Sequence, residues 1–263
     1  MPKIAANLTM LFTELPFPER FRAAARCGFT AVEHLFPYQH DMADLKAWLD
    51  ENGLEQVLIN MPAGDWQNGE RGLCCLPGRE AEFEAGIGQA IEYAKHLDCP
   101  RVHVVAGRVP ADAKSRAPYE DTYRRNLAWA ADRLAEHGLM ALVESINGKY
   151  DVPGFFVQTT SAVRAILAEL GRPNLKLQFD AYHVQIMQGD LVHNFRADLR
   201  DIGHIQIGNP PDRHEPDVGE INYPYFFQAI DDSGYDGWVA CEYKPKGDTA
   251  AGLGWARPYG VGG

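Results

Sequence analysis

The feature that most constrains the fold of this chain is a regular alternation of short apolar segments with longer amphipathic ones. The short segments hold five or six residues and are rich in β-branched and other apolar side chains, which is typical of buried strands. Eight segments have this character: residues 4–8, 31–35, 55–60, 101–105, 140–144, 175–180, 202–207 and 238–242. The chain is therefore expected to repeat a strand–helix unit from one end to the other.

The segments between the predicted strands have the periodicity of amphipathic helices. In residues 80–97 apolar side chains recur at positions i, i+4, i+7, i+11 and i+14, which gives one apolar and one charged face. Residues 120–137 and 161–170 repeat the pattern, and Thr159 and Thr160 are candidate N-caps of the latter segment. Glycines follow the helical segments, where a left-handed residue commonly ends a helix: Gly28, Gly53, Gly138, Gly171 and Gly234.

Eight strands alternating with helices over 263 residues predict an α/β protein with the (β/α)8 fold, the TIM barrel. A doubly wound sheet is the alternative, but no Gly-rich turn of the dinucleotide-binding kind follows the first strand. A length of about 250 residues is common for one barrel domain, and no linker or low-complexity segment divides the chain. We therefore expect a single domain over residues 1–263.

The charge of the chain limits its partners. With 25 Lys and Arg against 36 Asp and Glu the net charge is -11, which argues against a broad phosphate-binding surface and hence against nucleic acid as a partner. No apolar stretch approaches the roughly 18 residues of a membrane helix, and residues 1–7 do not resemble a signal peptide. Five cysteines without paired metal-type spacing predict reduced thiols. We expect a cytoplasmic protein that binds a small molecule.

Oxygen-bearing side chains end four consecutive predicted strands. Glu144, Asp180, Gln206 and Glu242 are separated by 36, 26 and 36 residues, each compatible with one strand–helix unit. In a barrel the carboxyl ends of all strands meet at the face that carries the active site. A single acidic residue at a strand end is more often a loop residue or a helix N-cap, but four oxygen-bearing side chains at successive strand ends, three of them acidic, favour one shared site.

A divalent cation is expected at this site. Three carboxylates that converge within a few ångströms repel one another and cannot all stay ionised without a cation. The predicted ligands Glu144, Asp180, Gln206 and Glu242 offer hard oxygen atoms, with neither Cys nor an obvious His among them, which favours Mg²⁺ or Mn²⁺ over Zn²⁺.

Short motifs along nearly the whole chain carry a family resemblance. They are AANL at 5–8, VE at 32–33, FPY at 36–38, PAGDW at 62–66, PGRE at 77–80, DAYH at 180–183, GEINY at 219–223 and CEYKP at 241–245. Together they resemble the hydroxypyruvate isomerase and 2-oxo-tetronate isomerase family, part of the xylose-isomerase-like barrel superfamily. That superfamily also includes ketose 3-epimerases and barrel-type apurinic endonucleases.

The resemblance implies roles for individual residues. Glu144 and Glu242 match the glutamates that act as proton donor and acceptor, and together with Asp180 and Gln206 they match the metal ligands. The ketose 3-epimerases usually place His where this chain has Gln206. His183 and Arg213 match positions that contact substrate. Without the resemblance, His183 would be read as a loop histidine that orients a metal ligand, and Arg213 as part of a surface ion pair.

The activity that the resemblance implies is the metal-assisted conversion of hydroxypyruvate to 2-hydroxy-3-oxopropanoate through an enediolate. Such a reaction needs a base for a weakly acidic C–H proton and a cation for the developing charge. Four further functions stay open: 2-oxo-tetronate isomerisation, ketose 3-epimerisation, phosphodiester hydrolysis and non-catalytic binding of a sugar acid. The sequence does not assign the base and the acid between the two glutamates.

Several further residues have two interpretations each. Glu33 and Asn60 end predicted strands and could line the pocket or fix the barrel mouth. Lys244 could bind a substrate carboxylate or form a salt bridge at the rim.

The long segment 62–78 could close over the site through Trp66 and Arg71, or it could be a solvated loop. Three aromatic residues, expected to be exposed, could form a subunit contact in a homo-oligomer or cover the barrel bottom: Tyr223, Tyr225 and Phe226.

Overall fold

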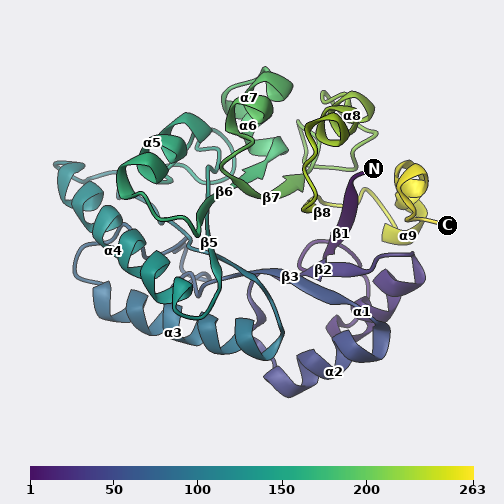
Figure 1. Cartoon of the computed structure of the whole chain (residues 1–263), viewed down its shortest axis with the longest axis horizontal. Helices are drawn as coiled ribbons and strands as arrows, with labels where there is room; N and C mark the ends of the chain where they lie inside the picture. The colour runs from purple at the N-terminus through teal and green to yellow at the C-terminus, as the bar shows by residue number, and fades with distance from the viewer.

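Eight parallel strands close a barrel in which each strand pairs with the next in the chain and β8 pairs with β1 (Figure 1). The structure is a computed structural model and describes residues 1–263. The strands are β1 (Lys3–Asn7), β2 (Ala31–Glu33), β3 (Glu55–Asn60), β4 (Arg101–His103), β5 (Met140–Glu144), β6 (Leu175–Asp180), β7 (Ile202–Ile207) and β8 (Trp238–Cys241). The predicted (β/α)8 barrel is confirmed.

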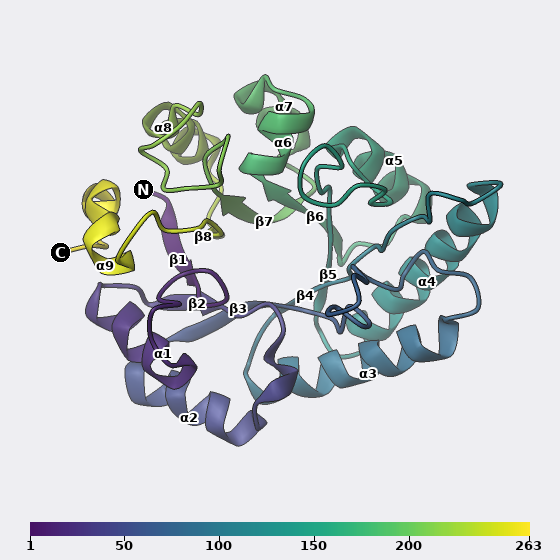
Figure 2. The same cartoon turned by 180° about the vertical axis from the view of Figure 1, so that it is seen from behind.

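Helices surround the barrel on its outer side, and both chain ends lie on the same side of the ring (Figures 1 and 2). The helices are α1 (Phe17–Arg26), α2 (Met42–Asn52), α3 (Glu80–His96), α4 (Ala117–Ala135), α5 (Thr160–Leu170), α6 (Ala181–Met187), α7 (Leu191–Asp198), α8 (Tyr223–Ser233) and α9 (Thr249–Gly252), with short 3-10 turns at Pro37–Gln39 and Leu253–Tyr259. None of the helices is long and apolar enough to cross a lipid bilayer.

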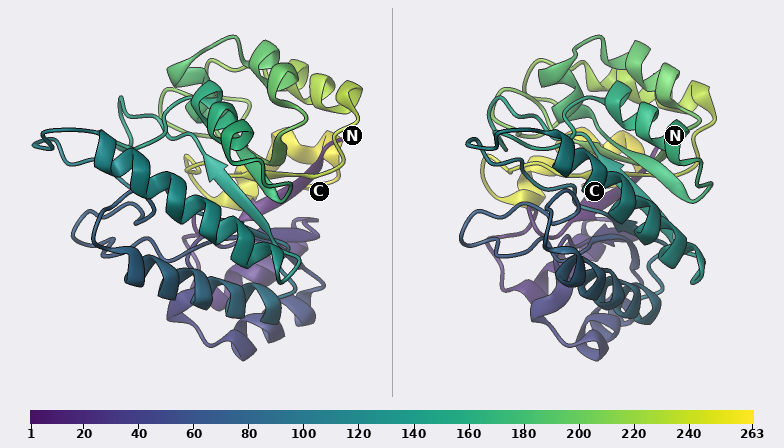
Figure 3. Two further views of the ribbon diagram at one scale, coloured as in Figure 1. Left: turned by 60° about the vertical axis from the view of Figure 1, so that its left-hand side comes forward. Right: turned by 90° about the vertical axis from the view of Figure 1, so that its left-hand side faces the viewer.

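The local signals in the sequence have the predicted structural roles. The apolar face of α3 is buried against the barrel, and α3 and α4 run side by side along its outside (Figure 3). Thr159 is the N-cap of α5, where its hydroxyl accepts a hydrogen bond from the Ala162 amide at 3.3 Å. All five glycines predicted to end helices adopt positive φ angles, so that each supplies the left-handed conformation which side chains disfavour.

The strands β2, β4 and β8 are shorter than predicted at their carboxyl ends. Beyond β4 the chain leaves the barrel and pairs instead with the segment 62–78, where Gly72 and Ala106 form an isolated bridge. Figure 3 shows these two connections at the same end of the barrel. The segment 62–78 is therefore attached to the mouth into which the strand ends point.

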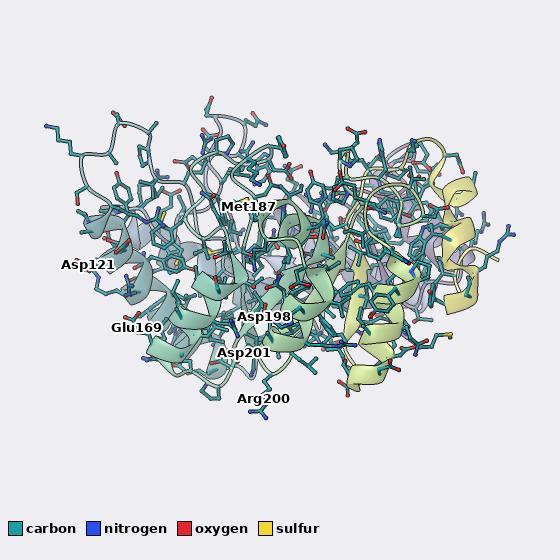
Figure 4. The ribbon with its side chains drawn as sticks, turned by 90° about the horizontal axis from the view of Figure 1, so that it is seen from above. Asp121, Glu169, Met187, Asp198, Arg200 and Asp201 are labelled. Atoms are coloured by element: carbon teal, nitrogen blue, oxygen red, sulfur yellow. The ribbon has the colours of Figure 1, made fainter.

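The two ends of the barrel are seen from the side in Figure 4. Arg200 and Asp201, which precede β7, lie at one end, and Met187 at the end of α6 lies nearer the other. Residues that follow strands and residues that precede them therefore occupy opposite ends, as the parallel order of the strands requires.

The prediction of three exposed aromatic residues in the first turn of α8 was wrong for two of them. Tyr223 and Phe226 are buried, and only Tyr225 is exposed. The Tyr223 hydroxyl donates to the Gly208 carbonyl at 2.8 Å, which ties α8 to the end of β7. A helix presents successive residues on different faces, so the three could not all point to solvent. The five cysteines are free thiols.

Candidate active site

Three of the four predicted strand-end residues deliver their carboxyl groups to one buried region. Glu144 and Asp180 are the last residues of β5 and β6, and Glu242 directly follows β8. All three are less than a tenth exposed. Glu144 and Glu242 both line a cavity of about 520 Å³ at the barrel mouth. The barrel therefore brings together acidic residues that are 36 to 98 positions apart in the chain.

Glu144, Asp180 and His183 form a compact cluster of possible metal ligands, in which one donor atom from each lies within 4.8 Å of the others. The His183 Nε2 atom is 3.5 Å from Glu144 Oε1 and 3.5 Å from Asp180 Oδ2. Asp180 caps α6 by accepting from the Tyr182 amide at 2.9 Å, and this fixes the first helical turn that carries His183. His183 therefore joins the candidate ligands, which the sequence alone had limited to oxygen donors.

Arg213 lies among the same carboxyl groups. Its Nη2 atom is 2.7 Å from Asp180 Oδ2 and 3.2 Å from Glu242 Oε2, and its Nη1 atom is 3.6 Å from Asp151 Oδ2. The guanidinium also lies over the Tyr182 ring at 4.8 Å. The interpretation of Arg213 as a surface ion pair is excluded, because its side chain is only 13% exposed and its partners are buried or half-buried.

Gln206 lies in the barrel interior, where both ends of its amide form hydrogen bonds. Its nitrogen donates to Glu33 Oε1 at 2.7 Å, and its oxygen accepts from Gln178 Nε2 at 2.5 Å. The same Gln178 nitrogen is 3.2 Å from Glu144 Oε2. The structure thus connects Gln206 to Glu144 through one amide, and its role as a metal ligand stays a prediction.

Glu33 belongs to the structural support of the barrel mouth rather than to the cavity. Its carboxyl accepts from Asn7 Nδ2 at 2.6 Å and from Gln206, and lies 2.8 Å from His204 Nε2. Its side chain is fully buried and does not line the cavity. Asn60, by contrast, does line it.

Burial controls the electrostatics of the site. It raises the pKa of Glu144 well above its usual range, and the nearby Glu242 and Asp180 raise it further. Burial also raises the pKa of Asp180, and that of Glu242 to about 8, although Arg213 acts in the opposite direction on both. Burial lowers the pKa of His183 well below its usual value, so its imidazole is neutral. The positive charge near these acids is therefore too small for all of them to be ionised.

A divalent cation fits this donor set. Hard carboxylate oxygens with one neutral imidazole nearby suit Mn²⁺ and Mg²⁺. Glu242 Oε2 is buried and accepts no well-aligned hydrogen bond, so it keeps a free lone pair at the site. The charge deficit and this atom both point to a cation as the natural complement of the cluster.

His103 is a cavity residue that sequence reasoning missed. It ends β4, lines the cavity, and has neither ring nitrogen in a hydrogen bond. Its Nδ1 atom lies 3.7 Å from Glu144 Oε2, and burial lowers its pKa to about 3. The strand-end criterion that identified the acids did not select His103, because the sequence predicted a longer strand, residues 101–105, with His103 in its middle, whereas the observed strand ends at this residue.

The comparisons with known proteins identify the family to which this barrel belongs. A family model described as "Xylose isomerase-like TIM barrel" matches residues 21–259. The chain is 54% identical to the 2-oxo-tetronate isomerase of Cupriavidus necator, over 98% of this chain and 99% of that protein. It is 45% identical to the hydroxypyruvate isomerase of Escherichia coli K12, over 98% and 100% of the two chains.

Among solved structures, a Brucella melitensis protein described as an AP endonuclease of family 2 superposes with a TM-score of 0.95. It is 45% identical and covers 98% of this chain and 99% of its own. Relatives of such identity over the full length share the fold, and the curated ones are named as isomerases. The chain is therefore an isomerase that belongs to the xylose isomerase-like TIM barrel family.

Proposed function

We propose that this protein converts hydroxypyruvate to 2-hydroxy-3-oxopropanoate. The observation that carries the proposal is the pair of buried glutamates, Glu144 and Glu242, which face one cavity beside Asp180 and Arg213. Two carboxyl groups on one small-molecule cavity are what a proton shift between adjacent carbons requires. The isomerase names of the curated relatives support the same reaction class.

These two side chains are placed to move the carbon-bound proton. In the forward direction one glutamate removes a proton from C3 of hydroxypyruvate, which leaves an enediolate across C2 and C3. A proton returned to C2, with the hydroxyl proton passed from the C3 oxygen to the C2 oxygen, gives the aldehyde. No atom is gained or lost. Either Glu144 or Glu242 can begin as the base, and the other can return the proton.

Glu144, Asp180, Gln206 and Glu242 would hold a Mg²⁺ or Mn²⁺ ion, with His183 within reach of the same position. When bound, the ion supplies positive charge that stabilises the two oxygens of the enediolate. Gln206 would have to release the hydrogen bond from Gln178 to offer its amide oxygen. His183 and Arg213 would contact the substrate oxygens, and Arg213 would keep the neighbouring carboxyls ionised.

A second substrate is favoured by a specific observation, namely the 54% identity to a 2-oxo-tetronate isomerase. The four-carbon acid undergoes the same shift across C2 and C3 and differs by one CH2OH group on C3. A difference of this size changes discrimination by only about 1 to 3 kcal/mol, so one site can process both acids.

Epimerisation and phosphodiester hydrolysis have less support. A 3-epimerase-like site would carry His where this chain has Gln206. A nuclease, which the description of the Brucella structure names, would need a basic surface for DNA, whereas this chain has a net charge of -11.

The test is a turnover assay on protein stripped with EDTA and titrated with Mg²⁺ or Mn²⁺, with hydroxypyruvate and 2-oxo-tetronate offered in parallel. Metal-dependent turnover of hydroxypyruvate supports the proposal, and a preference for 2-oxo-tetronate supports the second substrate. Inactivity on both acids, with or without metal, contradicts both substrates.

A further inference from the structure

We propose that Arg71 and Lys244 form a subsite at the rim of the cavity that binds the carboxylate of a hydroxy-keto acid. The inference rests on the proposed function, because it concerns the part of the substrate that does not react. Both residues line the cavity that Glu144 and Glu242 also line. Neither has a carboxylate within salt-bridge distance, although the chain carries eleven more acidic than basic side chains.

Arg213, the third cation of the cavity, is unavailable for this task. Its guanidinium already contacts Asp180, Glu242 and Asp151. A guanidinium shared among three carboxyl groups has little positive charge left for a fourth. A substrate carboxylate that enters this acidic cavity therefore needs a separate cation, and Arg71 and Lys244 are the two that line it without an acidic partner.

Arg71 is fixed in place before any ligand arrives. Its Nη1 atom donates to the Trp66 carbonyl at 3.0 Å and to the Glu70 carbonyl at 2.6 Å. Its guanidinium lies 3.9 Å from the centre of the Trp66 ring, which itself packs against Phe36. Two carbonyls and one aromatic face orient the guanidinium without neutralising its charge, and the remaining N–H groups can donate to a carboxylate.

The residues on either side of Arg71 are held by hydrogen bonds and backbone contacts. Glu70 accepts from Arg79 at 2.7 Å and from the Asp65 amide at 2.6 Å. Gly72 bridges to Ala106, and a Cβ atom there would lie 2.4 Å from the Val105 carbonyl. The position of Arg71 relative to the barrel is thus set by backbone contacts. A fixed cation loses less entropy on binding than a mobile one.

Lys244 is placed by its own backbone. Its amide donates to the Arg213 carbonyl at 2.7 Å, and its carbonyl lies 2.7 Å from His214 Nδ1. It stands two residues after Glu242, so the strand end that brings a reacting carboxyl to the cavity also brings this ammonium to its rim. The cavity therefore has acidic groups on its floor and cations at its edge.

This arrangement decides which class of substrate enters. Hydroxypyruvate and 2-oxo-tetronate both carry their carboxylate on C2, directly beside the reacting carbons. One subsite therefore serves both acids, and the extra CH2OH group of the longer acid lies on the other side of C3. The subsite is expected to select acids over neutral sugars and to be indifferent to chain length.

The experiment measures binding to the metal-loaded protein by calorimetry, with D-glycerate and its neutral amide glyceramide as matched probes. Neither probe can isomerise, so the result does not depend on turnover. The wild-type protein is expected to bind D-glycerate at least 10-fold more tightly than glyceramide. Arg71→Met and Lys244→Met should each weaken D-glycerate binding by about 10- to 100-fold, as the loss of a charged hydrogen bond predicts, and leave glyceramide binding unchanged.

Two further variants complete the design. Arg71→Lys keeps the charge and should retain most of the preference for the acid, and Lys246→Met, which removes an exposed cation outside the cavity, should change nothing. The subsite is refuted if wild-type protein shows no preference for D-glycerate, or if both Met variants keep it. A subsite that behaves as expected in a protein inactive on both acids would instead refute the proposed function alone.

Discussion

At the residue scale, the most informative side chains are Glu144 and Glu242. Carboxyl groups that are more than nine-tenths buried carry a large desolvation cost, and proteins keep them mainly where they perform chemistry. Both face the same cavity. Neither is needed to close the barrel, because Glu242 lies outside the strand pairing and the backbone of Glu144 makes its pairing contacts independently of its side chain.

The first prediction concerns these two glutamates. Glu144→Gln and Glu242→Gln keep the shape of each side chain but remove its ability to move a proton, so each should lower kcat by about 100- to 10,000-fold. Steady-state kinetics on hydroxypyruvate measures this. Calorimetry with D-glycerate should show that binding persists.

The matched control is Glu220→Gln, which alters an exposed glutamate in the connection after β7. It should leave kcat unchanged. Full turnover in either cavity variant would show that the altered glutamate moves no proton.

The second prediction concerns Glu33, whose carboxyl holds Asn7, His204 and Gln206 together. Glu33→Gln places an NH2 group against side chains that already donate, so we expect about 2 to 4 kcal/mol less stability. Urea unfolding of the metal-free protein measures the change. A loss below about 0.5 kcal/mol would mean that the three contacts rearrange without cost.

At the scale of the elements, two glycines with positive φ angles have different structural roles. Gly171 ends α5 with φ 62° and has no atom within 4 Å of a hypothetical Cβ. Gly72 has φ 110° and lies against the Val105 and Gly107 backbone. Gly171 is therefore required only for its left-handed backbone conformation. Gly72 is also required because a side chain at this position would collide with the neighbouring backbone.

The third prediction compares Gly171→Ala with Gly72→Ala. The first should cost about 1 kcal/mol of stability and leave kinetics unchanged, because only backbone strain is added. The second must shift the segment 62–78 away from Ala106, so it should also raise KM for hydroxypyruvate. Urea unfolding and steady-state kinetics on both variants separate the two effects. Equal KM values would show that this segment does not position Arg71.

At the scale of the whole molecule, the buried acids couple metal binding to stability. Burial raises the pKa of Glu242 from its ordinary value of 4.5 to about 8 in the folded protein. The fold therefore favours the protonated carboxyl. In the metal-free protein this contribution to stability is complete below pH 4.5 and is lost as the pH rises towards 8.

The fourth prediction follows from this loss of stability with rising pH. Without metal, the free energy of unfolding should fall by at least about 1 kcal/mol between pH 5 and pH 8.5. With saturating Mg²⁺ or Mn²⁺ the trend should weaken or reverse, because ionised carboxylates bind the cation more tightly. Urea unfolding at both pH values, with EDTA or with metal, measures it.

Glu242→Gln serves as the control, because the remaining acids of the chain also contribute to pH dependence. The variant should show a flatter profile in EDTA. A profile identical to that of the wild-type protein would mean that Glu242 is not a source of the effect.

The sequence alone predicted the eight strands, their alternation with helices, and the glycines and Thr159 that end or begin helices. These features depend on local periodicity and on single-residue conformational preferences, which short stretches of sequence contain. It also indicated Glu144, Asp180 and Glu242, because the geometry of a parallel barrel sends every strand end to one face.

The tertiary structure decided what surrounds those acids. Arg213 reaches Asp180 and Glu242, His183 joins the acidic cluster, and the amide of Gln206 is held by Gln178. Such contacts join residues from different strand–helix units, and they depend on side-chain directions that are fixed only once the barrel has closed. No local pattern contains them, whereas the positions of strands and of strand-end acids follow from the order of the residues themselves.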